Sequence, residues 1–182
     1  KALYRNGEFG KAADLALQAL ALGRKMKLDA PALNGLIEKT AFYLSQASRF
    51  EDAAVYYQQL LSALGAKKDE NAIKTRLMAG WSYLRAGQLK PASEMFDVVL
   101  SIADQLSYRK GGGVPGDVID FRPDRYKVLA LGFLAQMSTS PASRIPLRRD
   151  RLKIMRDWKG ALKSYALSSE NWARFDLKDC SL

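Results

Sequence analysis

Residues 76–103, RLMAGWSYLRAGQLKPASEMFDVVLSIA, decide the fold because they hold two apolar stripes at helical spacing with a glycine between them. The first stripe is formed by Leu77, Gly80, Tyr83 and Leu84. After Gly87, the second stripe is formed by Leu89, Ala92, Phe96, Val99 and Leu100. Side chains three and four residues apart lie on one face of an α-helix. The stretch therefore predicts two antiparallel helices joined by a turn at Gly87.

The pattern around this turn recurs twice toward the N-terminus. The positions of Gly87, Leu89, Ala92, Phe96 and Leu100 are taken first by Ser48, Phe50, Ala53, Tyr57 and Leu61, and then by Gly7, Phe9, Ala12, Ala16 and Leu20. The first copy departs at Ala16, where the other two copies carry an aromatic residue. This series resembles the tetratricopeptide repeat family, whose standard unit of about 34 residues is a helical hairpin. The turns here are 41 and 39 residues apart, which is similar to long-repeat members. The alternative is an unrelated all-α domain with generic amphipathic helices.

The resemblance implies an all-α fold of antiparallel helix hairpins that stack into a right-handed superhelix, or solenoid. We expect three repeat-like units in residues 1–107 and a loop rich in glycine and proline at 108–123. Residues 124–182 are expected to form a fourth, divergent hairpin with an inserted loop at 138–147 and a terminal helix. Two aspartates, Asp29 and Asp124, precede apolar periodic segments and are predicted to cap helix starts.

Composition excludes several kinds of chemistry. The 182-residue sequence has no histidine and one cysteine, Cys180, so histidine-dependent nucleophilic catalysis, histidine-containing zinc sites and internal disulfides are ruled out. No motif with a catalytic or phosphate-binding mechanism is present, since the glycines at 111–113 lack the ending of a phosphate loop. No apolar run is long enough for a membrane span. We therefore expect neither an enzyme nor a cofactor or metal.

In tetratricopeptide superhelices, the first helix of each hairpin lines a concave groove that binds a partner peptide or helix. Carried onto this sequence, the predicted partner-binding groove comprises Tyr4, Arg5, Phe42, Gln46, Lys74, Trp81, Leu84, Arg85 and Lys127. Trp81 and Arg85 are residue types that dominate binding energy at protein interfaces. A second interpretation has Trp81 packing between neighbouring units. The basic groove residues favour a partner segment with acidic character.

A second candidate surface follows from the charge distribution. The chain carries a formal charge of +10, and residues 144–163 contain eight basic and two acidic residues. The predicted basic surface comprises Arg148, Arg149, Arg151, Lys153, Arg156 and Lys163. It indicates nucleic-acid or anionic-surface binding as the alternative function. A solvated face of a packed helix explains the same pattern. Because the sequence opens inside a helix, we expect a piece of a larger protein or complex. As a separate expectation, we place it in the cytoplasm or nucleus.

Overall fold

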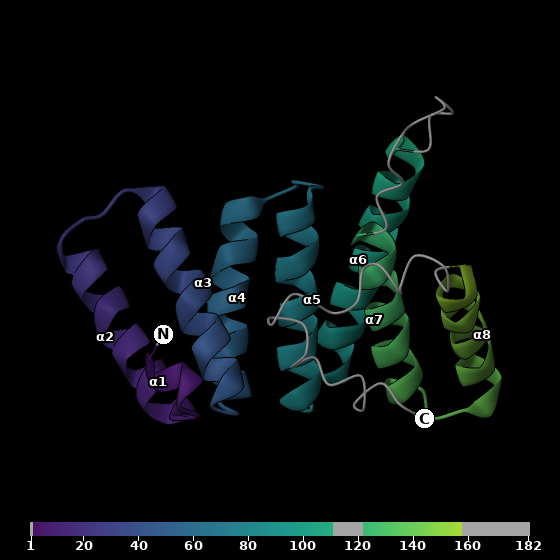
Figure 1. The fold of residues 1–182 in the computed structure, drawn as a ribbon, viewed down its shortest axis with the longest axis horizontal. Coiled ribbons are helices and arrows are strands. Elements are labelled where there is room, and N and C mark those ends of the chain that lie inside the picture. Colours follow the sequence, from purple (N-terminus) through teal and green to yellow (C-terminus); the bar gives the residue numbers. More distant parts are fainter. Residues whose placement is uncertain (1, 111–121, 158–182) are drawn as a thin grey trace. The chain divides into compact units, whose positions relative to one another are not determined.

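The computed structural model describes residues 2–110 and 122–157, and within these ranges it contains eight α-helices and no strand (Figure 1). The helices are α1 (Ala2–Arg5), α2 (Phe9–Lys25), α3 (Ala30–Gln46), α4 (Phe50–Leu64), α5 (Glu70–Arg85), α6 (Leu89–Lys110), α7 (Arg122–Met137) and α8 (Pro141–Asp157). The all-α fold predicted from the apolar spacing is confirmed.

The chain divides into two compact units, Lys1–Met95 and Phe96–Leu182. In the first unit, each helix from α1 to α5 packs against the next one along the chain, which places the helices in a row (Figure 1). In the second unit, α7 packs against α8, and Phe96 stacks on Phe133 with their ring centroids 5.1 Å apart. This succession of hairpins is a helical repeat-like architecture; the right-handed superhelix stays a prediction.

The three turns predicted to be equivalent, at Gly7, Ser48 and Gly87, share one backbone geometry. Their φ angles are all positive, at +81°, +60° and +76°. In each turn, this residue's amide donates to the carbonyl three residues back, and the next amide donates to the carbonyl five residues back. These six hydrogen bonds measure 2.8–3.1 Å. The pair of bonds is the Schellman end of an α-helix, which requires a left-handed residue at this point. The three bends are therefore locally alike.

Aspartate side chains begin two of the helices. The Asp29 carboxylate accepts a hydrogen bond from the amide of Ala32, and the Asp69 carboxylate accepts one from the amide of Ala72, each at 2.8 Å. Each bond satisfies an amide that has no partner inside the helix. The cap predicted at Asp29 is present, and Asp69 forms a second one.

Small and aromatic residues of the repeated pattern form the packed interior. The alanines are Ala12, Ala53 and Ala92, which are 6%, 0% and 0% exposed. Tyr57 and Phe96 fill the aromatic position and are also buried. Leu61 and Leu100, at the last position of the pattern, are only half-buried. Leu60 and Val99 are buried in their place, three residues beyond the ring.

The sequence predicts a loop at 138–147, and this prediction is wrong because α8 begins at Pro141. Ser140 caps this helix: the Ser143 amide donates to the Ser140 hydroxyl at 3.3 Å, and the Arg144 amide donates to the Ser140 carbonyl at 3.1 Å. Pro141 takes the first helical position, where its missing N–H has no intrahelical acceptor. Pro146 stands inside the helix. The helix therefore includes both prolines, although the sequence predicts a loop here.

The bounds of the loop predicted at 108–123 are wrong, because helical residues occupy both ends of this range. Helix α6 continues to Lys110, and α7 begins at Arg122, ahead of the cap predicted at Asp124. The part of the fourth hairpin's predicted second helix that follows Asp157, and the predicted terminal helix, lie outside the described residues.

Candidate partner-binding surface

Two predicted groove residues, Tyr4 on α1 and Phe42 on α3, lie in direct contact, with ring centroids 5.4 Å apart. Phe9 and Tyr43 complete the cluster. The Tyr4 ring lies 5.4 Å from that of Phe9 and 5.7 Å from that of Tyr43. All four side chains are half-buried. Tilted and edge-on ring pairs contribute about 0.5–1.5 kcal/mol each beyond their buried area. The cluster therefore fixes the first two hairpins against each other and leaves aromatic surface exposed.

A second cluster joins Phe50, Trp81 and Arg85. The Phe50 and Trp81 rings meet edge-to-face, with centroids 5.3 Å apart and an interplanar angle of 88°. The Arg85 guanidinium carbon lies 5.2 Å from the centroid of the Phe50 ring. Trp81 is half-buried and Arg85 is exposed. Trp81 on α5 thus packs against Phe50 of α4, in the neighbouring unit, and is still partly exposed. The repeat pattern predicts Phe50 only as a helix residue and misses its place in this cluster.

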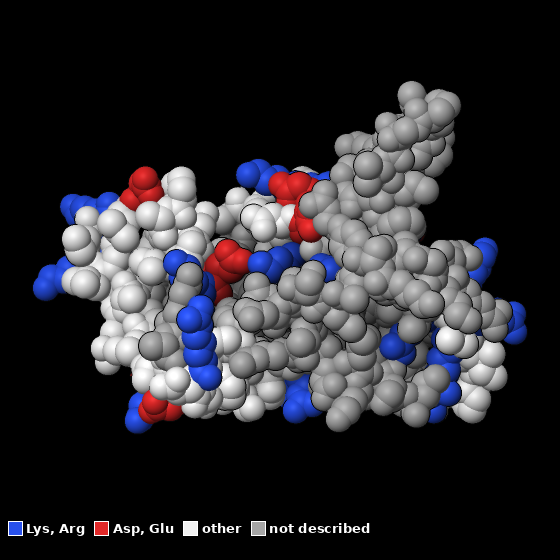
Figure 2. Space-filling model, in the orientation of Figure 1, with Lys and Arg blue, Asp and Glu red and all other residues white. Residues whose placement is uncertain are grey.

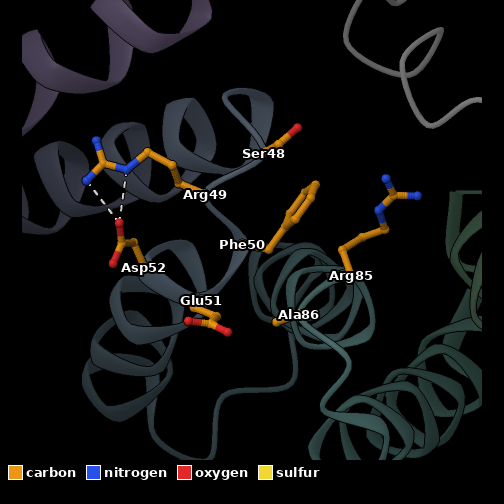
Figure 3. Close-up of a pocket in the computed structure, with 7 residues that line it drawn as sticks. All are labelled: Ser48, Arg49, Phe50, Glu51, Asp52, Arg85 and Ala86. Carbon is orange, nitrogen blue, oxygen red and sulfur yellow. Dashed lines mark hydrogen bonds and ion pairs between the residues drawn. The ribbon is translucent and has the colours of Figure 1, made fainter.

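A cavity of about 330 Å³ lies beside this cluster (Figure 3). Its lining residues are Ser48, Arg49, Phe50, Glu51, Asp52, Arg85 and Ala86. Figure 3 shows Arg49 and Asp52 facing each other on one side of Phe50, with Arg85 on the other side. The Arg49 guanidinium is 2.9 Å from both the Asp52 and the Asp14 carboxylate.

The two arginines of the cavity differ in their availability to a ligand. Two carboxylates already neutralise Arg49, whereas Arg85 makes no ion pair within the described residues and lies over the Phe50 ring. Its N–H groups form a planar fork that matches a carboxylate. Glu51 lines the same cavity, so a run of carboxylates would meet repulsion there. A single carboxylate beside an apolar group fits this site best.

Polar contacts also connect α3 to α5. The Lys74 ammonium lies 3.4 Å from the Glu38 carboxylate, and the two side chains are about half exposed. The Ser45 and Ser82 hydroxyls hydrogen-bond each other at 3.2 Å in the buried interior. Burial raises the pKa of the nearby Tyr57 phenol, and a hydrogen bond with Ser45 offsets part of this rise. An exposed ion pair contributes at most about 1 kcal/mol, so Lys74 remains able to turn toward a partner.

The other predicted groove residues are placed differently from one another. Arg5 is exposed at the end of α1, while Gln46 and Leu84 are half-buried near the ends of α3 and α5. Lys127 does not fit the prediction. It belongs to the second unit, its side chain is 15% exposed, and its ammonium lies 2.6 Å from the Asp104 carboxylate. This cation is already neutralised and is not a candidate for binding a partner carboxylate.

The predicted basic surface falls largely on α8. Arg149 and Lys153 are exposed, and Arg148 and Arg151 are half-buried. Arg156 lies within α8, but its side chain is outside the described part, and Lys163 lies outside it altogether. Figure 2 shows the side of the molecule that is turned toward the viewer in Figure 1. On its described surface, lysines and arginines are scattered, with acidic side chains beside some of them.

The described residues contain no group of histidine, cysteine or carboxylate side chains that is suited to hold a metal ion. In that same part of the chain, no helix combines the length and apolar character needed to cross a bilayer. The fold defines an all-α, helical repeat-like protein. No protein-family model, no curated protein and no solved structure matches the chain. The resemblance to tetratricopeptide repeats therefore rests on the repeated residues themselves.

Proposed function

We propose that the chain is a non-enzymatic adaptor that binds a segment of another protein along α1, α3 and α5. The observation that carries this proposal is the Arg85 guanidinium, which rests on the Phe50 ring beside a cavity and makes no ion pair within the described residues. The groove positions implied by the tetratricopeptide resemblance support it, because Tyr4 touches Phe42 and Lys74 pairs with Glu38 across consecutive first helices.

The site gives binding energy from two sources. A hydrogen bond to a charged group contributes about 1.5–3 kcal/mol, and Arg85 offers several such donors to one carboxylate. Contact with Phe50 already restricts the Arg85 side chain, so less conformational entropy is lost on binding. Trp81 adds exposed aromatic surface to the same site. The favoured partner is therefore a peptide segment or helix in which a carboxylate lies next to an apolar side chain.

An array of immobilised peptides of varied sequence tests the proposal. We expect the folded chain to select peptides that combine one Asp, Glu or C-terminal carboxylate with a neighbouring apolar residue. Arg85→Gln should weaken the selected peptides about tenfold or more, as one charged hydrogen-bonding group is lost. The variant should keep its circular-dichroism spectrum, because Arg85 is exposed.

Arg24→Gln is the matched control, because Arg24 is also exposed and its guanidinium donates a hydrogen bond to the Gln59 amide oxygen, at 3.0 Å, away from the cavity. This control should bind the same peptides as the unaltered chain. Selection of basic peptides, or equal binding by Arg85→Gln, would contradict the proposal. Trp81→Ala is a weaker test because it also removes the ring that packs on Phe50.

A further inference from the structure

Helix α8 presents one face that no other described part of the chain covers. Ile145 and Leu152 on this face are large aliphatic residues that are 54% and 49% exposed. They are seven residues apart, which is about two helical turns, so they lie one above the other. Arg148, Arg149 and Lys153 line the same hollow as these two residues. We call these five residues the α8 face.

The opposite side of α8 is occupied by the protein itself. Leu147 and Ile154 are half-buried on this side, and α8 packs against α7. The Arg144 guanidinium donates to the Ser138 carbonyl at 2.6 and 3.2 Å, which ties the start of α8 to the end of α7. At about 100° per residue, Asp150 lies about 140° around the helix from Ile145. The α8 face therefore combines aliphatic and cationic side chains, and this carboxylate lies beyond its edge, about 60° around the helix from Lys153.

We propose that the α8 face binds an acidic amphipathic helix of a partner protein. Within the described residues, Arg148, Arg149 and Lys153 make no ion pair, so their charges are available to glutamates or aspartates of the partner. Ile145 and Leu152 match aliphatic side chains seven residues apart on a facing helix. This surface lies in the second unit and does not rest on the proposed adaptor site.

The aliphatic pair distinguishes this partner from other anionic ones. Nucleic-acid binding draws mainly on contacts to phosphates, which would leave Ile145 and Leu152 against solvent or charge. A helix that lies in a bilayer interface needs a broad apolar face, whereas two isolated aliphatic side chains among three cations offer little. An acidic amphipathic protein helix can contact both the aliphatic pair and the three cations of the α8 face.

A fluorescence-anisotropy titration of the whole chain tests the proposal. The probe is a labelled helical peptide with leucines seven residues apart, flanked by glutamates. The comparison probes are a duplex DNA oligonucleotide and vesicles that contain phosphatidylserine. Two double variants separate the contributions: Ile145→Ser with Leu152→Ser removes the aliphatic pair, and Arg149→Glu with Lys153→Glu reverses the charges. All four residues are exposed, so circular dichroism should show unchanged helix content.

We expect each double variant to weaken peptide binding about tenfold or more. The control Lys67→Glu with Lys90→Glu changes the net charge equally at exposed sites on other parts of the chain, and it should leave peptide affinity nearly unchanged. No peptide binding at millimolar concentration, or no loss of affinity without the aliphatic pair, would overturn the proposal. Tighter binding of DNA or vesicles than of the peptide would overturn it as well. None of these results bears on the Arg85 site, which the separate peptide-array experiment tests.

Discussion

The positive φ angles of the three turns predict opposite effects for two substitutions. At Gly87, a Cβ atom would meet nothing within 4 Å, so Gly87→Ala introduces no clash and costs only the left-handed backbone. That conformation costs a residue with a side chain about 1–2 kcal/mol. Alanine returns about 0.5–1 kcal/mol by restricting the unfolded chain. The net expectation is a destabilisation of about 1 kcal/mol.

Ser48 already carries this strain, with φ at +60°. Ser48→Gly relieves it, and the greater freedom of glycine in the unfolded chain offsets part of the gain. We expect a stabilisation of about 0.5–1 kcal/mol. Introducing a glycine is therefore favourable at this turn, although glycine inside a helix is unfavourable.

Urea unfolding followed by circular dichroism at 222 nm measures both effects as shifts of the midpoint at constant slope. Gly35→Ala is the control, since Gly35 lies inside α3, has no positive φ, and leaves open space where the added methyl group would lie. This control should stabilise the protein by about 1 kcal/mol through helix propensity. Destabilisation by Ser48→Gly, or equal shifts for Gly87→Ala and Gly35→Ala, would show that the turns do not share the inferred geometry.

Three further predictions concern other elements. Pro146→Ala should stabilise α8 by about 1–2 kcal/mol and raise the helical signal, because it restores the amide that Pro146 lacks inside the helix; an unchanged or lower melting temperature would contradict this. Asp69→Ala should cost about 1 kcal/mol by removing the cap on the Ala72 amide, whereas Asp69→Asn should cost less in the same urea assay. The raised pKa of Tyr57 means that its stabilising contribution is complete below the unfolded phenol pKa of about 10 and is lost as pH rises beyond it. Above this pH, stability should fall by up to about 1.4 kcal/mol per pH unit, and Tyr57→Phe should show a shallower fall between about pH 10 and 11.

Much of the fold could be predicted because its signals are local. A turn such as Gly87 depends on residues within one helical turn on either side, and the spacing of small and aromatic residues sets the buried stripe. The cap at Asp29 could be predicted for the same reason, because it involves only Asp29 and the residues that follow it directly. Ser140 and Pro141 carry an equally local signal, an N-cap followed by proline at the first helical position, but the nearby Pro146 makes the segment resemble a loop.

The candidate site could be predicted only in part, because its contacts join distant residues. Phe50 and Arg85 are 35 positions apart, and nothing in either local sequence states that the guanidinium rests on that ring. Lys127 is predicted to face the groove, yet its charge is neutralised by Asp104 from another helix. Burial and pairing of this kind depend on how helices pack, which apolar spacing does not specify.

The turns and the candidate site are physically linked. Phe50 follows the left-handed residue Ser48 by two positions, and Arg85 precedes the left-handed residue Gly87 by two. Each Schellman turn fixes the direction in which the next helix leaves, so it also fixes where an aromatic side chain two residues later lies. Phe9 follows Gly7 in the same way and packs on Tyr4. At two of the three turns, Gly7 and Ser48, the residue two positions later is therefore an aromatic ring that packs on a first helix, whereas Leu89 takes this position after Gly87. At Phe50, that ring contacts the one guanidinium in the described cavity that no carboxylate neutralises.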